Sequence, residues 1–193
     1  MKEKDTTKRK QRIMVYFIAF IMVSSIAGFL YTGSGTQKIS YNGYKMARRG
    51  DMWVTSINKK EAIFNYFPTE VIDIQINPEI ITKLTNTAEI DITSEQNNTH
   101  VESVALASYE LGQELGFHYN KFLRIGFTAN NSFNVPIITC DDATPLIPVI
   151  YFVESNETKI YKQENCIIAE ADTSVDVIRI KDRLLYGIHG IIR

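Results

Sequence analysis

The side chains best suited to chemistry are Cys140 and the two aspartates that follow it, Asp141 and Asp142, in ITCDDATPLIPVIYF (138–152). A thiolate beside a carboxylate can act as a nucleophile, the three side chains can form one corner of a metal site, and the cysteine can be half of a disulfide. The other cysteine of the chain is Cys166. Thiols stay reduced in the cytosol and pair in oxidising compartments, so the interpretation depends on where this segment lies relative to a membrane.

The N-terminal residues have the pattern of a membrane anchor. Residues 1–12 carry six basic and two acidic side chains, and residues 13–31 (IMVYFIAFIMVSSIAGFLY) carry no charge. A helix of this length spans roughly 28 Å, close to the hydrocarbon thickness of a bilayer. Basic residues before the span favour a cytoplasmic N-terminus. We therefore expect the lipid bilayer to be a partner through 13–31, in a single-pass protein of the cell membrane whose C-terminal domain lies outside.

Two other N-terminal signals compete with an anchor. A cleaved secretory signal would use a small-x-small site such as Ser25-Ile26-Ala27, but the apolar run continues to Tyr31 without a polar break. A pilin-type signal would place a small residue before the apolar run, where this chain has Arg12. An uncleaved anchor is favoured over a cleaved signal, and the pilin-type signal is rejected.

The charge of the outer part argues against nucleic-acid binding. Residues 13–193 carry 15 basic and 20 acidic side chains, a net charge of about −5. Proteins that bind nucleic acid use a basic patch or stripe against the phosphates. We expect no nucleic-acid partner.

The predicted organisation has four regions: a cytoplasmic basic tail (1–12), a transmembrane helix (13–31), a flexible linker rich in small polar residues (32–40) and one extracytoplasmic α/β domain (41–193). The outer domain is predicted to contain one mixed sheet, with an N-terminal β-meander, a βαβαβ unit, a C-terminal β-hairpin region and a closing helix. The meander is indicated by the turn signal Asn42-Gly43 and by MWVTSI and AIFNYF around NKKE. The later elements are strands at 71–76, 88–93, 122–128, 148–153, 158–162 and 166–171, and helices from Asn77-Pro78, over 101–116 with Gly116 ending it, and from Thr173 or Ser174.

The closing helix is predicted to be amphipathic. Its buried stripe would contain Val177, Ile180 and Leu184, continued by Ile188 and Ile191. The basic side chains between these positions, Arg179, Lys181 and Arg183, are expected on a face exposed to solvent.

For the cysteines, an outer location favours a Cys140–Cys166 disulfide. Closing the loop of 25 residues between them would stabilise the fold by about 3–4 kcal/mol in the chain-entropy model. Two free buried thiols, and redox or nucleophilic chemistry at Cys140, are the alternatives.

The chemical alternatives lack their usual motifs. A thioredoxin-like dithiol requires Cys-x-x-Cys, and structural zinc requires three or four Cys or His ligands, whereas His100, His118 and His189 are isolated in the sequence. Asp141 and Asp142 offer too few oxygens for calcium. The sequence contains no hydrolase or phosphate-loop motif. We therefore predict no catalytic residue, no metal and no cofactor.

Three sequons, at Asn97, Asn130 and Asn156, are possible glycosylation sites. Each falls in a segment predicted to be a loop, which agrees with an outer location.

Five segments of the outer domain carry a resemblance to other proteins: FNYFPTEVIDI, IDIT, TCDDATPLIPVIYFVESNETKI, NCIIAEA and DRLLYGIHGI. In these segments the sequence resembles a group of uncharacterised single-pass, envelope-facing membrane proteins of small-genome archaea. The resemblance implies a shared architecture and no particular activity.

We expect a non-enzymatic membrane-anchored protein that binds or organises a protein partner at the cell envelope. The alternative is an extracytoplasmic enzyme, a thiol oxidoreductase or hydrolase, that uses Cys140 with Asp141 or Asp142.

Overall fold

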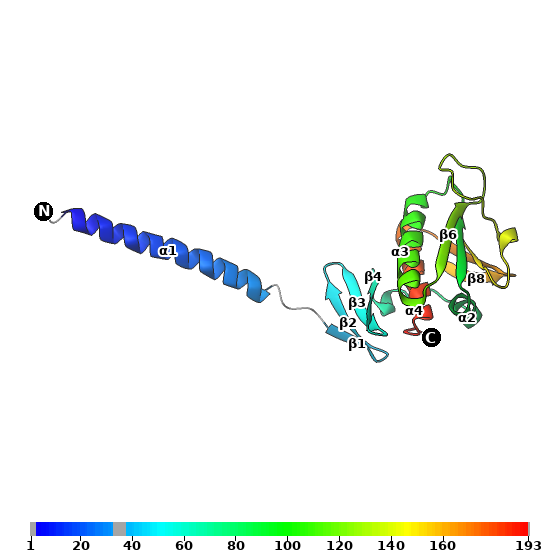
Figure 1. Cartoon of the computed structure of the whole chain (residues 1–193), viewed down its shortest axis with the longest axis horizontal. Helices are drawn as coiled ribbons and strands as arrows, with labels where there is room; N and C mark the ends of the chain where they lie inside the picture. Colours follow the sequence, from blue (N-terminus) through cyan, green and yellow to red (C-terminus); the bar gives the residue numbers. More distant parts are fainter. Residues whose placement is uncertain (1–2, 33–37, 193) are drawn as a thin grey trace. The chain divides into compact units, whose positions relative to one another are not determined.

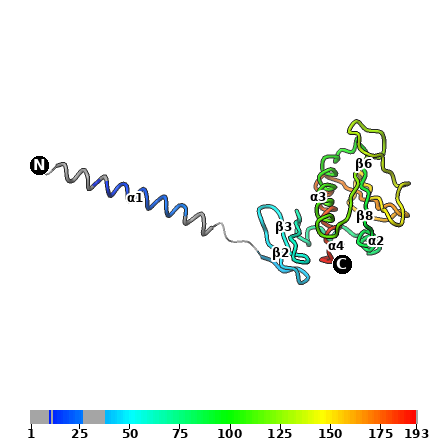
Figure 2. Tube along the Cα trace, viewed as in Figure 1, coloured from blue at the N-terminus to red at the C-terminus, as the bar shows by residue number. Residues whose placement is uncertain are grey.

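The computed structural model describes residues 3–32 and 38–192, and in the first of these ranges it describes side chains only at 10 and 12–26. The chain divides into two compact units, residues 1–37 and residues 38–193. The first unit contains α1 (Glu3–Thr32), and the second contains all the strands and the remaining helices (Figure 1). The Cα trace in Figure 2 follows the same course.

The structure contradicts the predicted transmembrane helix. Within the described residues, none of the helices combines the length and the apolar character that a membrane crossing requires. The apolar part of α1 with described side chains runs over 13–26, roughly 21 Å of helix against a hydrocarbon core of about 30 Å. The side chains of 27–31, and the linker positions 33–37, lie outside the described residues. The predicted fold class that included this helix, and the predicted single-pass location, are corrected accordingly.

The first sheet of the second unit is antiparallel, and it confirms the predicted meander. Its order is β1-β2-β3-β4, with turns at Asn42-Gly43 and Asn58-Lys59. β1 starts at Lys38, inside the segment predicted as linker. The strands are β1 (Lys38–Tyr41), β2 (Tyr44–Arg49), β3 (Met52–Ile57) and β4 (Lys60–Phe64).

A second, mixed sheet has the order β6-β5-β7-β9-β8, so the unit is a mixed α/β domain with two sheets rather than the single sheet predicted. All neighbours are parallel except β8 and β9. The five strands predicted from residue 88 onward are present. Because β9 lies between β7 and β8, the antiparallel hairpin is β8–β9. The elements are β5 (Glu89–Ser94), β6 (Phe122–Phe127), β7 (Val149–Glu154), β8 (Lys159–Gln163) and β9 (Cys166–Ala171), the helices α2 (Pro78–Asn86), α3 (Val101–Tyr119) and α4 (Ser174–Ile188), and the short turns η1 (Pro68–Glu70) and η2 (Cys140–Asp142).

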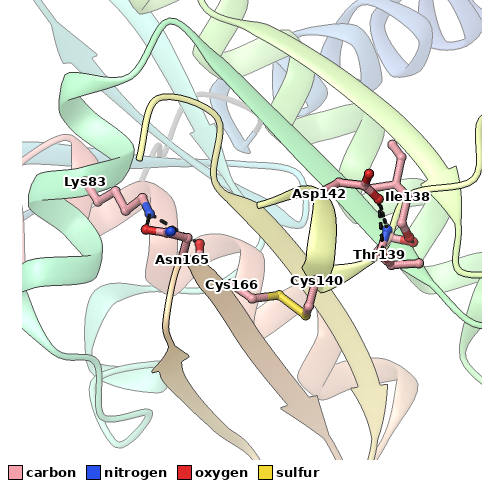
Figure 3. Close-up of a disulfide and its surroundings, with 8 residues drawn as sticks. Lys83, Ile138, Thr139, Cys140, Asp142, Asn165 and Cys166 are labelled. Carbon is pink, nitrogen blue, oxygen red and sulfur yellow. Dashed lines mark hydrogen bonds between the residues drawn. A yellow bond between two sulfur atoms is a disulfide. The ribbon is translucent and has the colours of Figure 1, made fainter. Parts of the chain in front are cut away.

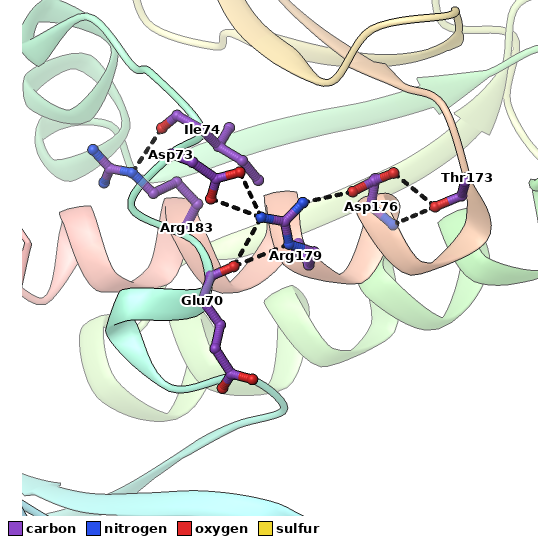
Figure 4. Close-up of polar contacts among 7 residues, drawn as sticks. All are labelled: Glu70, Asp73, Ile74, Thr173, Asp176, Arg179 and Arg183. Carbon is purple, nitrogen blue, oxygen red and sulfur yellow. Dashed lines mark hydrogen bonds and ion pairs between the residues drawn. The ribbon is translucent and has the colours of Figure 1, made fainter.

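The predicted strand at 71–76 is wrong, and the βαβαβ unit therefore lacks its first strand. Val71 and Ile74 are buried three positions apart, which is the spacing of a turn rather than a strand. Figure 4 shows the cause. The Nε of Arg183 on α4 donates to the carbonyl of Ile74 (3.0 Å), so this carbonyl is not available to a sheet. Arg179 on the same helix binds the carboxylate of Asp73 (2.6 Å) and the carbonyl of Glu70, just before the segment (2.8 Å).

The predicted starts of α2 and α4 are confirmed, but the predicted end of α3 is wrong. The Asn77 side chain accepts from the backbone N–H of Glu79 at the start of α2, and Thr173 accepts from that of Asp176 at the start of α4. Gly116 does not end α3 as predicted. The helix continues to Tyr119, and Asn120 ends it in the left-handed conformation (φ 54°).

The two faces of the second sheet are covered differently. Helices α3 and α4 pack on the face that carries Ile90 and Ile92, and together with the first sheet they form the main core. The opposite face is covered by the segment between β6 and β7, where Ile138 packs with Val149, Cys166 and Ile168. The disulfide therefore lies on the face without helices.

The predicted exposed face of α4 is also wrong. Lys181 is 1% exposed, Asp182 is 0% exposed and Arg183 is 5% exposed. The helix contacts α3, α2, η1 and β9, so neighbours surround it and no broad face is left for solvent. Charged side chains in this helix therefore have to find polar partners within the protein.

Gly126→Ala is expected to reduce the free energy of unfolding by about 1–3 kcal/mol. A Cβ at 126 would lie 2.4 Å from the carbonyl oxygen of Pro136, which itself accepts a hydrogen bond from Phe127. The matched control is Gly112→Ala in α3, where the nearest atom would be 3.9 Å away, and it should stabilise by roughly 0.5–1 kcal/mol. Urea denaturation of both variants checks this, and an equal effect of the two substitutions would contradict the packing assigned to segment 136–138.

Candidate functional site

The predicted disulfide is confirmed. Cys140 in η2 and Cys166 at the start of β9 are bonded, with their Cα atoms 5.3 Å apart (Figure 3). Beside Cys166, the ammonium of Lys83 binds Asn165 through its side-chain oxygen (2.9 Å). No free cysteine is present in the described part of the chain. Neither sulfur is then a thiolate, and the thiol chemistry considered for Cys140 has no nucleophile in this state.

Of the two aspartates after Cys140, Asp142 has a local structural role. The carboxylate of Asp142 accepts from the backbone N–H of Thr139 (2.8 Å) and from its hydroxyl (3.0 Å), which closes η2 as a capping box. Asp141 is exposed beside it. Within residues 3–32 and 38–192, no group of three or more His, Cys, Asp or Glu side chains has the arrangement of a metal site.

The three sequon asparagines, Asn97, Asn130 and Asn156, are exposed and lie outside helices and strands. Their predicted loop positions are confirmed. Attachment of sugars to them stays a prediction.

Two of the three histidines that are far apart in the sequence, His118 and His189, lie next to each other in the structure. The rings of His118 and His189 lie 5.1 Å apart, and Tyr119 is hydrogen-bonded to His189 (2.7 Å). Burial lowers the pKa of both imidazoles, that of His189 to about 3. His100 is apart from them and binds Ser174 and the carbonyl of Asp172 at the start of α4.

The polar centre of the domain lies along the free edge of β4. Helix side chains, rather than another strand, bind backbone groups at Glu61 and Ile63 on this edge. Glu114 on α3 accepts from the N–H of Ile63 (3.2 Å), and His118 donates to the carbonyl of Glu61 (3.1 Å). Beyond the end of β4, one oxygen of Asp182 accepts from the N–H groups of Asn65 (2.8 Å) and Tyr66 (2.7 Å). The edge is therefore capped at Glu61 and Ile63 and at the two residues just beyond its end.

Lys181 is the only cation in contact with this group of carboxylates among the described residues. Its ammonium lies 2.6 Å from the other oxygen of Asp182, 2.8 Å from Glu110 and 2.6 Å from the side-chain oxygen of Asn65. Three oxygens thus surround a buried ammonium, which is the arrangement that makes a buried charge tolerable.

Burial raises the pKa of both capping carboxyl groups. That of Glu114 rises to about 7, although the bond from Ile63 and the charge of Lys181 oppose the rise. That of Asp182 rises to about 6, and Lys181 again opposes the rise. Glu114 therefore changes its protonation state near neutral pH.

A cleft of about 180 Å³ opens beside these groups, between β3, β4 and α3. Glu110, Glu114 and Lys181 lie on its polar side, and Met52, Ile63 and Tyr109 form its apolar side. Leu106 and Phe117 do not line the cleft, but they lie on the same side of α3 as Tyr109 and are also exposed. We define the α3 face as Leu106, Tyr109 and Phe117 with Met52 and Ile63.

The residues of this site lie far apart in the sequence, and no motif connects them. Glu110 and Glu114 are spaced one helical turn apart, and Lys181-Asp182 interrupts an apolar run, but neither pattern shows that the two pairs meet. The carboxylate of Glu114 also lies 3.3 Å from His118, so carboxylates and a histidine do converge, contrary to what the sequence indicated. His118 does not line the cleft, however.

Comparisons with family models, with curated proteins and with solved structures found no match to this chain. The resemblance to envelope-facing archaeal proteins stays a prediction that these comparisons do not test.

Replacing both cysteines, Cys140→Ser with Cys166→Ser, is expected to lower the free energy of unfolding by about 3–4 kcal/mol, because the denatured chain loses its cross-link. Urea denaturation measures the change, and the wild-type protein in excess reductant should show the same loss. Mass spectrometry of non-reduced peptides should show the two cysteines joined. Free thiols in the untreated protein would contradict the assignment.

Glu114→Gln is expected to change how stability depends on pH. A carboxyl group with a pKa of about 7 in the folded state and 4.5 when unfolded stabilises the fold below pH 4.5, and this contribution is lost as pH rises through 7. Between pH 4 and pH 8 the variant should therefore gain about 2–3 kcal/mol relative to wild type. Denaturation at several pH values measures this. Glu102→Gln, at an exposed position of α3, should follow the wild-type profile, and a pH-independent difference for Glu114→Gln would refute the role of burial.

Proposed function

We propose that residues 38–192 form a non-enzymatic binding domain that docks a protein partner on the α3 face. The observation that carries the proposal is the exposure of large apolar side chains along one side of α3. Leu106 is 48%, Tyr109 61% and Phe117 57% exposed. Their spacing of three and eight residues puts them on the same side of the helix.

The composition of this surface is that of a protein interface. Met52 and Ile63 extend the apolar surface from α3 onto β3 and β4 through the walls of the cleft. Aromatic side chains and methionine are enriched at the centres of protein interfaces, and a contiguous exposed apolar patch marks an interaction site. Lys60 lies over the ring of Phe117 (4.8 Å) and supplies part of a polar rim.

The charge of the cleft favours a basic group on the partner. Glu110 and Glu114 line the cleft with Lys181 as the one cation of its lining, and Lys181 is already paired with Glu110 and the buried Asp182, so acidic side chains outnumber cations at this position. A lysine or arginine side chain with an apolar stem could enter between Met52 and Tyr109 and bind Glu110 or Glu114. The proposed partner segment is therefore apolar with at least one basic residue.

The catalytic alternative has less support from the geometry. The residues that line the cleft include no serine, threonine or cysteine, and its one amine, Lys181, already contacts three oxygens. A carboxyl group with a pKa near 7, Glu114, is present, but a proton donor or acceptor alone does not define a reaction.

Photo-crosslinking in cells that express the full-length chain tests the proposal. A benzophenone amino acid at position 109 should form a discrete adduct with a protein partner, and the same group at position 133 should not. Phe133 is a matched control because it is also aromatic and exposed, in the loop after β6. Recovery of only the uncrosslinked chain from position 109, or the same adducts from both positions, would count against docking on the α3 face.

In the same experiment Leu106→Glu is expected to abolish the adduct at position 109, because a carboxylate would be desolvated in the apolar contact. The side chain is exposed, so the free energy of unfolding should stay within about 0.5 kcal/mol of wild type. Denaturation of the purified variant provides that control. An unchanged adduct in a stably folded variant would refute the role of the α3 face.

A further inference from the structure

A second concave surface lies between α2 and α4, apart from the α3 face. This α2–α4 groove has a volume of about 240 Å³, and its walls are mainly apolar. Its lining residues are Ile76, Pro78, Ile81, Thr82, Gly187 and Ile192, with Arg183 as the charged member and Gly190 beside it.

Arg183 is a buried cation without an anionic partner among the described residues. It is 5% exposed, and burial lowers its pKa. Its Nε donates to the carbonyl of Ile74 (3.0 Å), and one terminal nitrogen, NH1, is buried without a hydrogen-bond partner. No carboxylate of the described chain lies within 4.0 Å of its guanidinium nitrogens. Burying a charge in this way is unfavourable unless an anion binds it.

Arg179, in the same helix, differs from Arg183 because carboxylates balance its charge. Arg179 lies one turn earlier on α4, and it binds Asp73 (2.6 Å) and Asp176 (2.8 Å) as well as a backbone carbonyl (Figure 4). In the same view Arg183 has one dashed contact, to Ile74. The difference is local, because the acidic side chains available to Arg179 have no counterpart at the α2–α4 groove.

The floor of the groove is formed by helix backbone. A Cβ at Gly187 would lie 2.4 Å from the Cδ1 of Ile81, so glycine permits the close approach of α2 to α4 at this point. A cavity of about 150 Å³ lined by apolar side chains can hold benzene. The α2–α4 groove is larger, and it suits an aliphatic or aromatic group of about six to ten carbons.

We propose that the α2–α4 groove binds a small amphiphilic monocarboxylate. The carboxylate pairs with the guanidinium of Arg183, and the apolar tail lies along Ile76, Ile81 and Ile192. Charge complementarity selects the anionic head, and the walls select the apolar tail. This site is independent of docking on the α3 face, and neither proposal requires the other.

Titration of the purified full-length chain with four probes tests the proposal without any substitution. Isothermal titration calorimetry should show saturable binding of octanoate. Octan-1-ol has the same tail without the charge and should bind at least tenfold more weakly, and octylammonium should bind no better than octan-1-ol. Acetate, which lacks the tail, should not bind measurably. Equal affinity for octanoate and octan-1-ol, or no saturable binding of octanoate, would overturn the proposal.

Variants then locate the bound molecule. Arg183→Met should weaken octanoate binding at least tenfold and leave octan-1-ol binding unchanged. Because this substitution also removes the bond to Ile74, a second pair on α2 serves as a check. Thr82→Trp should block the α2–α4 groove, because Thr82 lines it, whereas Thr85→Trp should not. The two variants are matched because both threonines are exposed and both donate to the backbone carbonyl four residues earlier. Equal octanoate affinity in the two tryptophan variants would place the ligand elsewhere and refute the site.

Discussion

The free edge of β4 is the constraint on which the rest of the larger unit depends. A strand edge presents backbone N–H groups, and each one buried without a partner would cost on the order of 1–3 kcal/mol. Here α3 and α4 supply the acceptors: Glu114 for Ile63, and Asp182 for Asn65 and Tyr66. Hydrogen bonds to ionised groups are stronger than neutral ones. The first sheet is thus joined to the helices that cover the second sheet by directional polar contacts as well as by the shared core.

This way of capping an edge has consequences for the chemistry of the domain. A carboxylate that is buried between the helices and this edge has to leave water, which raises its pKa and makes a nearby cation favourable. Lys181 supplies that cation, and it is held by Glu110 and Asn65 at the same time. The charged side of the cleft is therefore where this cap reaches the surface, and an apolar helix face lies next to it. The side chains that cap the edge and those of the proposed α3 face therefore meet in the lining of one cleft.

Much of the fold could be predicted because its signals are local. Signals of a few adjacent residues predict the turn at Asn42-Gly43 and the helix cap at Asn77. The disulfide between Cys140 and Cys166 follows from the presence of two cysteines in the chain. The strand expected at 71–76 is wrong because VIDIQI alternates as a strand would, while Arg183, 109 positions after Ile74, binds the Ile74 carbonyl instead. The candidate site was missed for the same reason. Glu114 and Ile63 are 51 positions apart, and Asp182 and Asn65 are 117 apart.

The error on α4 shows how the two proposed sites differ. Helical periodicity assigned Lys181 and Arg183 to solvent on the assumption that a helix of this kind has one exposed face. Surrounded by other elements, α4 instead buries both cations, and the remaining question for each is where its counter-charge lies. The counter-charges of Lys181 are Glu110 and Asp182, within the chain, so this lysine has mainly a structural role. The proposed binding at the α3 face therefore depends on the apolar side chains nearby. For Arg183 the described residues provide a carbonyl and no anion, and a buried guanidinium in an apolar groove is then best explained by a counter-charge that arrives from outside.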